Sequence, residues 1–413
     1  MVQAEISIAC PKIERDMLDR DLLLLNVIRA SLRETLSQDD IRKSFDGTLE
    51  WGKLLEYAQR NGISSLLYHI LKTAGADVLL PKQFISQLEI SYYSVFTQNV
   101  SYYRELELIL DSFRHSGIQP IVLKGAALGE TLYLDMSLRP LSDIDMFIRK
   151  RDLLKAKKEL LLIGYENIVK DYHQGHGDEF GEHFTYLKHE SIPLYVDLHT
   201  RLFPPICNQD SEINGLWDRS VEIQMGGISG LALSLEDTVL YLCSHAFKHG
   251  LPIRLLWLYD LALMFLEHGE SLNWKFMEKR ARMLGIYRIS GHVLEVARQT
   301  FDIPLPDGAA SWLRSCELNR VERFLSANES GRAIWYHALR LRSVKVMKDK
   351  LRFIAGRMFP SRDYIMWRYS ISNPKLVFWG YLYRFYYFHV YFLKTIRAVF
   401  TSMCGSRVFR RSA

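Results

Sequence analysis

The stretch that decides the fold is residues 121–148, which read IVLKGAALGETLYLDMSLRPLSDIDMFI. It starts with a short apolar run that ends just before Gly125, and an amphipathic segment, 126–134, follows directly. After a proline break comes a second apolar run, which carries Asp143 and Asp145. This order predicts a strand, a glycine turn, a helix and a second strand with two carboxylates.

Asp143 and Asp145 are the first candidate site residues. Side chains two positions apart on a strand point to the same face, so these carboxylates are expected side by side. Two carboxylates this close repel each other unless a cation lies between them. Mg²⁺ (or Mn²⁺), which takes oxygen ligands and is usually shared with substrate phosphates, suits such a pair. Taken alone, an Asp-Ile-Asp motif is also typical of a solvated strand end.

The glycine turn upstream favours the metal-site interpretation. Gly125 lets the backbone come close to a ligand, and the free N–H groups of the helix that starts at Ala126 are suited to hold a phosphate. Further along, residues 183–189 and 193–199 predict a hairpin. Asp197 lies inside its second strand between Val196 and Leu198, where a carboxylate needs a partner. That partner is either a shared metal ion or a nearby Lys or Arg.

These residues carry a resemblance to a known family. The matching positions are Lys124, Gly125, Arg139, Asp143, Asp145 and the run Val196-Asp197-Leu198-His199. They resemble the active-site signature of the polymerase-β-type nucleotidyltransferase superfamily and, more narrowly, its bacterial branch of uncharacterised nucleotidyltransferases. Motifs within 49–68, 245–262 and 359–369 are similar to other parts of that branch. Two features depart from the superfamily pattern: Ala126 replaces the usual Ser or Gly, and the gap from Gly125 to Asp143 is long.

The resemblance implies an α+β fold with a small, mixed-sheet, polymerase-β-like core between helical regions. The expected parts are an N-terminal helical region (1–116), the nucleotidyltransferase core (117–203), a second helical region (204–330) and a basic, aromatic-rich helical tail (331–413). Within the core we expect strands at 118–123 and 143–148 and helices at 126–134 and 152–162.

The resemblance also implies a function. Asp143, Asp145 and Asp197 are expected to hold the metal and perform catalysis, and Lys124, Gly125, Ala126 and Arg139 to bind the nucleotide. The reaction would transfer an NMP group from an NTP, ATP being the first choice, to a hydroxyl-bearing acceptor in peptide or polysaccharide tailoring. Two alternatives stay open: transfer of a sugar or phosphate group at the same site, and a non-catalytic, membrane-associated accessory protein. A nucleic-acid acceptor is not excluded.

Composition narrows the location of the protein. The chain has 413 residues and five scattered cysteines without a CxxC pair, which argues against a disulfide framework or a zinc site and fits a reducing cytoplasm. The first residues lack the basic and apolar regions of a signal peptide. We therefore expect a cytoplasmic protein. A second expectation is that it makes peripheral contact with the inner face of the membrane.

The expectation of membrane contact is based on the tail, residues 331–413. Residues 331–413 carry 17 Lys and Arg against two acids, a net charge of +15, whereas the first 330 residues carry −9. Segment 376–393 is almost uncharged and aromatic, but Arg384 at its centre disfavours a membrane span. The tail is expected either to pack on the body or on a second copy, or to lie at a membrane surface.

Two further groups of histidines have open assignments. His245 and His249 are spaced i and i+4 on an expected helix, which suits a metal site but more readily a structural or substrate-contacting role. The polar segment 172–183 contains three histidines and three acids, and a mobile substrate loop is favoured there over a metal site.

Asp260, in an apolar helical run, is expected to pair with a cation or cap a neighbouring helix.

Overall fold

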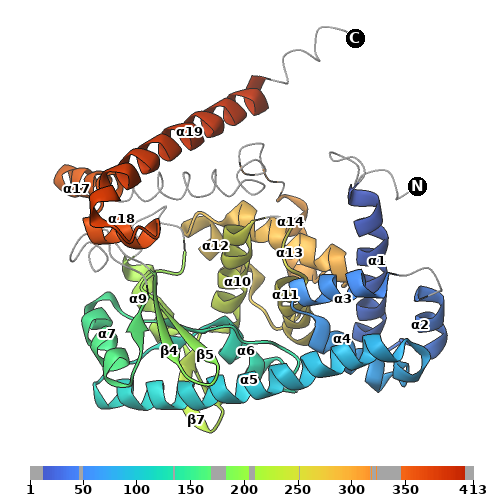
Figure 1. Ribbon diagram of the computed structural model, residues 1–413. Helices are drawn as coiled ribbons and strands as arrows, with labels where there is room; N and C mark the ends of the chain where they lie inside the picture. The colour runs from blue at the N-terminus through green and yellow to red at the C-terminus, as the bar shows by residue number, and fades with distance from the viewer. Residues whose placement is uncertain are drawn as a thin grey trace.

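The computed structural model describes residues 13–45, 50–133, 135–168, 183–203, 210–250, 252–316, 318, 322 and 346–404. The fold contains a mixed seven-stranded sheet that is flanked by helices (Figure 1). The predicted α+β fold, with a mixed sheet flanked by helical regions, is confirmed.

The strand order in the sheet is β3-β4-β5-β2-β1-β7-β6. The strands are β1 (Ile121–Val122), β2 (Ile144–Phe147), β3 (Glu166–Asn167), β4 (His183–His189), β5 (Pro193–His199), β6 (Val221–Met225) and β7 (Ile228–Ala232). β2 runs parallel to β5 and β1 parallel to β7, while the remaining neighbours are antiparallel. The two parallel pairings therefore join distant parts of the chain at the centre of the sheet.

The sequence predicts one of the two hairpins and misses the other. β4 and β5 have the predicted bounds, but the hairpin of β6 and β7 lies in a region for which we expected only helices. Gly226 and Gly227 connect these strands with φ of +60° and +102°. Two adjacent positive φ values match a tight hairpin turn, in which glycine carries no steric penalty. A Gly-Gly pair between short alternating runs is thus a signal for this hairpin.

Helices cover both faces of the sheet. On one face, α5 (Lys82–His115) and α7 (Leu153–Leu162) form a core with Val122 and Met146. On the other face, Ile121 and Phe147 join a core built by the remaining helices of the body. Since Asp145 has the same strand parity as Phe147, its side chain belongs to this second face. The candidate site therefore lies on the face of the sheet that packs against the helices following the sheet in the chain.

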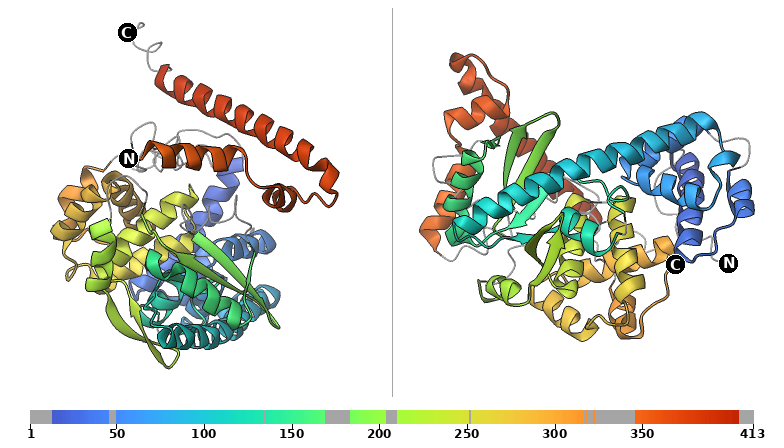
Figure 2. Two further views of the ribbon diagram at one scale, coloured as in Figure 1. Left: turned by 90° about the vertical axis from the view of Figure 1, so that its left-hand side faces the viewer. Right: turned by 90° about the horizontal axis from the view of Figure 1, so that it is seen from below.

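Two helical regions share that second core. The first contains α1 (Ile13–Leu32), α2 (Gln38–Ser44), α3 (Trp51–Arg60), α4 (Ser64–Thr73) and η1 (Asp77–Leu79). The second contains α10 (Leu235–His249), α11 (Leu255–His268), α12 (Trp274–Met283), α13 (Tyr287–Phe301), η3 (Asp307–Ala309) and α14 (Ala310–Arg314). The 34-residue α5, about 51 Å long at 1.5 Å per residue, runs from the first region to the sheet (Figures 1 and 2).

Shorter elements complete the sheet region, and four further elements lie in the part of the tail that the structure describes. In the sheet region these are α6 (Lys124–Thr131), η2 (Lys150–Asp152) and α9 (Asp210–Asp218). In the tail they are α17 (Met347–Met358), α18 (Arg362–Arg368), η4 (Pro374–Leu376) and α19 (Val377–Cys404). Helix α19 packs on α18 and η4 and extends away from the body (Figures 1 and 2). None of the described helices has the length and apolarity needed to cross a membrane.

A buried ion pair ties the helical region to the segment before β2. Arg139 donates from Nε to Asp260 Oδ1 at 2.9 Å and from Nη2 to Asp260 Oδ2 at 2.7 Å. The hydroxyl of Tyr133 also donates to Asp260 Oδ1, at 2.7 Å. Arg139 is 5% exposed and Asp260 is fully buried, so each charge depends on the other for its stability. The expected pairing of Asp260 with a cation is confirmed.

We predict that Asp260→Ala lowers the free energy of unfolding by about 3–5 kcal/mol, because it leaves the buried charge of Arg139 without its partner. Urea denaturation measures the change. Asp307→Ala, at an exposed aspartate of η3, is the control and should stay within about 0.5 kcal/mol of the wild type. An Asp260→Ala variant as stable as this control would contradict the structural importance of the pair.

Candidate active site

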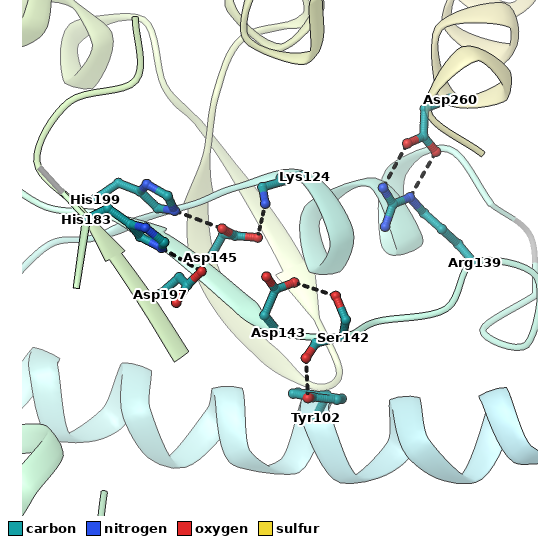
Figure 3. A network of polar contacts seen from close by, with 10 residues as sticks. All are labelled: Tyr102, Lys124, Arg139, Ser142, Asp143, Asp145, His183, Asp197, His199 and Asp260. Atoms are coloured by element: carbon teal, nitrogen blue, oxygen red, sulfur yellow. Dashed lines mark hydrogen bonds and ion pairs between the residues drawn. The ribbon is translucent and has the colours of Figure 1, made fainter. Parts of the chain in front are cut away.

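Three carboxylates meet where β2 and β5 lie side by side. Asp145 on β2 and Asp197 on β5 are direct partners in the parallel register, and Asp143 precedes β2 by one residue. One carboxylate oxygen from each of the three residues lies within 4.8 Å of the others. We call Asp143, Asp145 and Asp197 the carboxylate site (Figure 3). The structure brings the three predicted residues together, while their role as metal ligands remains a prediction.

Asp145 is the most enclosed of the three and is held on both sides. Its Oδ2 lies 2.7 Å from Nζ of Lys124, and its Oδ1 accepts a hydrogen bond of 2.8 Å from Nε2 of His199. Burial alone would raise the pKa of Asp145, but the charge of Lys124 and the hydrogen bond from His199 lower it well below its ordinary value. Lys124 and His199 therefore favour the charged form of Asp145 at the centre of the site.

The other two carboxylates are more open to a ligand. Asp143 is half-buried and accepts a 3.0 Å hydrogen bond from the hydroxyl of Ser142. Burial and the charge of Asp145 raise the pKa of Asp143 to about 6. Asp197 bonds through Oδ2 to His183 at 2.7 Å, whereas its Oδ1 is buried without a hydrogen-bond partner among the described residues. The carboxylate oxygens of Asp143 and Asp197 can therefore accept a further positively charged partner.

That arrangement fits a hard divalent cation. Mg²⁺ prefers carboxylate oxygens together with phosphate and water ligands. The carboxylate site supplies three such side chains, and Asp197 Oδ1 is a buried acceptor that a cation would satisfy. The donor set of this site therefore agrees with the metal expected from the sequence.

The turn between β1 and α6 forms the opposite side of the site. Lys124 has φ +30°, a conformation that non-glycine residues rarely adopt, and its ammonium group returns to Asp145. Helix α6 starts at Lys124 without a side-chain cap, so its first N–H groups are not bound by a capping side chain. The hydroxyl of Tyr103 bonds to the carbonyl of Ala126 at 2.9 Å and anchors the turn to α5.

Gly125 lies in a closely packed part of the turn. A Cβ at this position would lie 2.7 Å from Leu141 Cδ2 and 3.1 Å from Arg139 Nη1, closer than side chains normally approach. Arg139 thus lies beside the turn, and two of its nitrogens bind Asp260 (Figure 3). Its expected contact with the nucleotide phosphates remains a prediction.

Helices α10 and α11 contribute an aromatic group near Lys124. His245 lies 4.5 Å from His249 and 4.9 Å from Trp257, measured between ring centroids. Burial and the charge of Lys124 lower the pKa of His245 well below its ordinary value. Among the described residues, these two histidines belong to no group of three metal-binding side chains. This favours the structural or substrate-contacting interpretation of the pair.

Sequence reasoning included His199 in the active-site resemblance and His183 in the polar segment, but assigned neither of them to the carboxylate site. A signal was present, because His199 follows Asp197 by two positions on β5 and His183 is its cross-strand partner on β4. The rest of the polar segment, 172–182, lies outside the described residues. Its favoured interpretation as a substrate loop therefore stays a prediction.

Comparison with known proteins bears on the family of this chain. No curated protein matches the chain significantly. A family model described as "uncharacterised nucleotidyltransferase" matches residues 47–302, more than half of the sequence. The match includes the carboxylate site, the turn at Gly125 and the helices α10 and α11. The chain therefore belongs to this uncharacterised nucleotidyltransferase family.

Proposed function

We propose that the protein transfers an NMP group from an NTP, ATP being the first choice, to a hydroxyl-bearing acceptor. The observation that carries this proposal is the convergence of Asp143, Asp145 and Asp197 beside the turn at Gly125. Membership in a nucleotidyltransferase family supports it. Peptide or polysaccharide tailoring, as in natural product biosynthesis, is the proposed setting.

In this proposal the acceptor oxygen attacks the α-phosphorus of the NTP. The bond from that phosphorus to the bridging oxygen breaks, and pyrophosphate leaves. Asp143 and Asp145 hold Mg²⁺ or Mn²⁺, and Asp197 completes the set. A bound divalent cation supplies positive charge to the attacking and leaving oxygens. The carboxylate of Asp197 is also the proposed acceptor of the proton from the acceptor hydroxyl.

The turn at the start of α6 is the proposed phosphate-binding element. Backbone N–H groups at Gly125 and Ala126 face no capping side chain and suit the β- and γ-phosphates. Lys124 is close enough to the carboxylate site to bind both a phosphate and Asp145. Arg139 contributes its positive charge to the same region through its position beside Gly125.

Two alternatives to NMP transfer involve the same carboxylate site. Transfer of a sugar or a phosphate group would need the same cation site, and product masses after incubation with NTPs distinguish it from NMP transfer. A non-catalytic accessory role is disfavoured by the retention of all three carboxylates, since a degenerate site usually loses one.

We predict that Asp143→Ala and Asp145→Ala each abolish NTP-dependent transfer, because the cation loses a carboxylate ligand at the reacting phosphate. Mass spectrometry of products, formed with mixed NTPs and cell extract as the source of acceptor, measures the activity. Circular dichroism checks that each variant is folded.

The matched control is Asp111→Asn, at an exposed aspartate of α5, and it should retain full activity. The Asp143→Asn/Asp145→Asn double variant preserves size and shape while removing both charges. Wild-type turnover by this double variant would rule out the carboxylate site as the centre of the reaction.

We also propose that the protein is cytoplasmic and that its tail contacts an anionic membrane surface. The outer side of α19 exposes large apolar residues, among them Phe378, Trp379, Leu382, Tyr383, Phe385 and Tyr386, with exposed fractions of 45–66%. Arg384 is turned to the other side, 5.6 Å from the ring centroid of Tyr364 on α18. An aromatic surface within a strongly basic segment complements a membrane interface that carries negative charge.

We predict that the full chain co-sediments with vesicles containing phosphatidylserine at low salt and less at high salt, because each Lys or Arg near an anionic leaflet contributes about 1 kcal/mol. Phe378→Glu/Trp379→Glu should reduce binding strongly. Leu108→Glu, at an exposed leucine of α5, is the control and should bind like the wild type. Failure of the wild type to bind these vesicles at low salt would exclude the membrane contact.

A further inference from the structure

Two histidines lie directly behind the carboxylate site. Nε2 of His199 donates to Asp145 Oδ1 at 2.8 Å, and Nε2 of His183 donates to Asp197 Oδ2 at 2.7 Å (Figure 3). The two imidazole rings are stacked, with centroids 4.6 Å apart and planes inclined by 8°. Each of the two paired-strand carboxylates therefore has its own imidazole donor.

The register of the sheet explains this pairing. His183 on β4 is the direct partner of His199 on β5, and His199 is the direct partner of Phe147 on β2. Each histidine bonds to the carboxylate two positions before its direct partner, namely Asp197 and Asp145. Such diagonal neighbours on one face of a sheet are within reach of long and aromatic side chains. The same offset of two residues, from β4 to β5 and from β5 to β2, thus accounts for both hydrogen bonds.

We propose that His183 and His199 are positioning residues, which orient the carboxylates of Asp197 and Asp145 for binding the catalytic cation. This inference rests on the proposed function, because it concerns the same site. An imidazole on one oxygen stops the carboxylate from rotating, and outer hydrogen bonds of this kind set the orientation and basicity of metal ligands. For Asp197, the bond to Oδ2 leaves Oδ1 as the buried acceptor without a partner.

The ring stack makes the two histidines one unit. His199 is buried, whereas the side chain of His183 is 42% exposed and covers it from the solvent side. Loss of the His183 ring removes the hydrogen bond to Asp197 and also the surface against which His199 is held. We therefore expect the effects of the two substitutions on cation binding to be non-additive.

Direct coordination is the competing arrangement. Nitrogen atoms of His183 and His199 and an oxygen of Asp197 lie within 4.8 Å of one another, a spacing that also suits a metal ion. In the structure, however, both Nε2 atoms are hydrogen-bonded to carboxylates. A positioning residue and a ligand differ in one observable, which is the presence of an imidazole nitrogen bound to the metal.

The test is the affinity of the full-length protein for Mn²⁺, titrated by electron paramagnetic resonance with a non-hydrolysable ATP analogue present. His183→Ala and His199→Ala should each weaken Mn²⁺ binding by about 10- to 100-fold, the usual effect of losing an outer hydrogen bond to a metal ligand. Glutamine places an amide N–H at a similar reach, so His183→Gln and His199→Gln should recover most of the affinity. His189→Ala, at the far, exposed end of β4, is the matched control and should bind like the wild type.

Folding and direct coordination are checked separately. His183 is partly exposed, so its alanine variant should remain folded by circular dichroism even if His199→Ala does not. A folded His183→Ala protein with wild-type Mn²⁺ affinity would overturn the proposal. A ¹⁴N coupling on bound Mn²⁺ that disappears in the alanine variants would also overturn it, in favour of direct ligation. If the wild type binds no Mn²⁺ with the nucleotide analogue, the proposed function itself fails.

Discussion

The parallel pairing of β2 with β5 is the constraint on which the site depends. It places Asp145 and Asp197 opposite each other on one face of the sheet, and Asp143 next to them. Three carboxylates at this distance repel one another in a partly buried place, so the fold must supply positive charge or hydrogen-bond donors. Lys124, His183 and His199 provide part of that compensation. The remainder is the physical reason to expect a cation there.

The surrounding elements hold that arrangement in place. Strand β1 lies next to β2 and brings the turn at Gly125 to the site, where an added side chain would have to displace Leu141 and Arg139. The ion pair of Arg139 with Asp260 then joins this turn to α11. Through these contacts the helical region, the turn and the carboxylates are parts of one packed unit. The charge of Arg139 therefore has a structural use that is independent of any nucleotide.

Local patterns in the sequence predict much of this structure. The alternation of side chains places Asp143 and Asp145 on one face, and the hairpin of β4 and β5 has its predicted bounds. The side chain of Ser234 caps α10 by accepting a hydrogen bond from the backbone N–H of Asp237. The helix after Gly125 was expected at 126–134 and instead spans Lys124–Thr131, because the chain turns sharply at Lys124 itself.

Contacts between distant segments could not be read in this way. The sequence alone does not determine which acid Arg139 pairs with, since Asp260 is 121 positions away. The two hydrogen bonds of His183 and His199 need the relative register of three strands, one of which precedes the hairpin by a long connection. The hairpin of β6 and β7 had a readable Gly-Gly signal, but its pairing with β1 had none. Pairing partners are a property of the folded chain, whereas periodicity is a property of each segment.

The most direct test of the central claim is a crystal structure of the protein with Mn²⁺ and a non-hydrolysable NTP analogue, with data collected for the anomalous signal of manganese. We expect an anomalous peak at coordination distance from oxygens of Asp143, Asp145 and Asp197, with the phosphates of the analogue between this peak and the turn at Gly125. A bound analogue whose manganese peak lies elsewhere, with the three carboxylates not coordinated, would contradict the account.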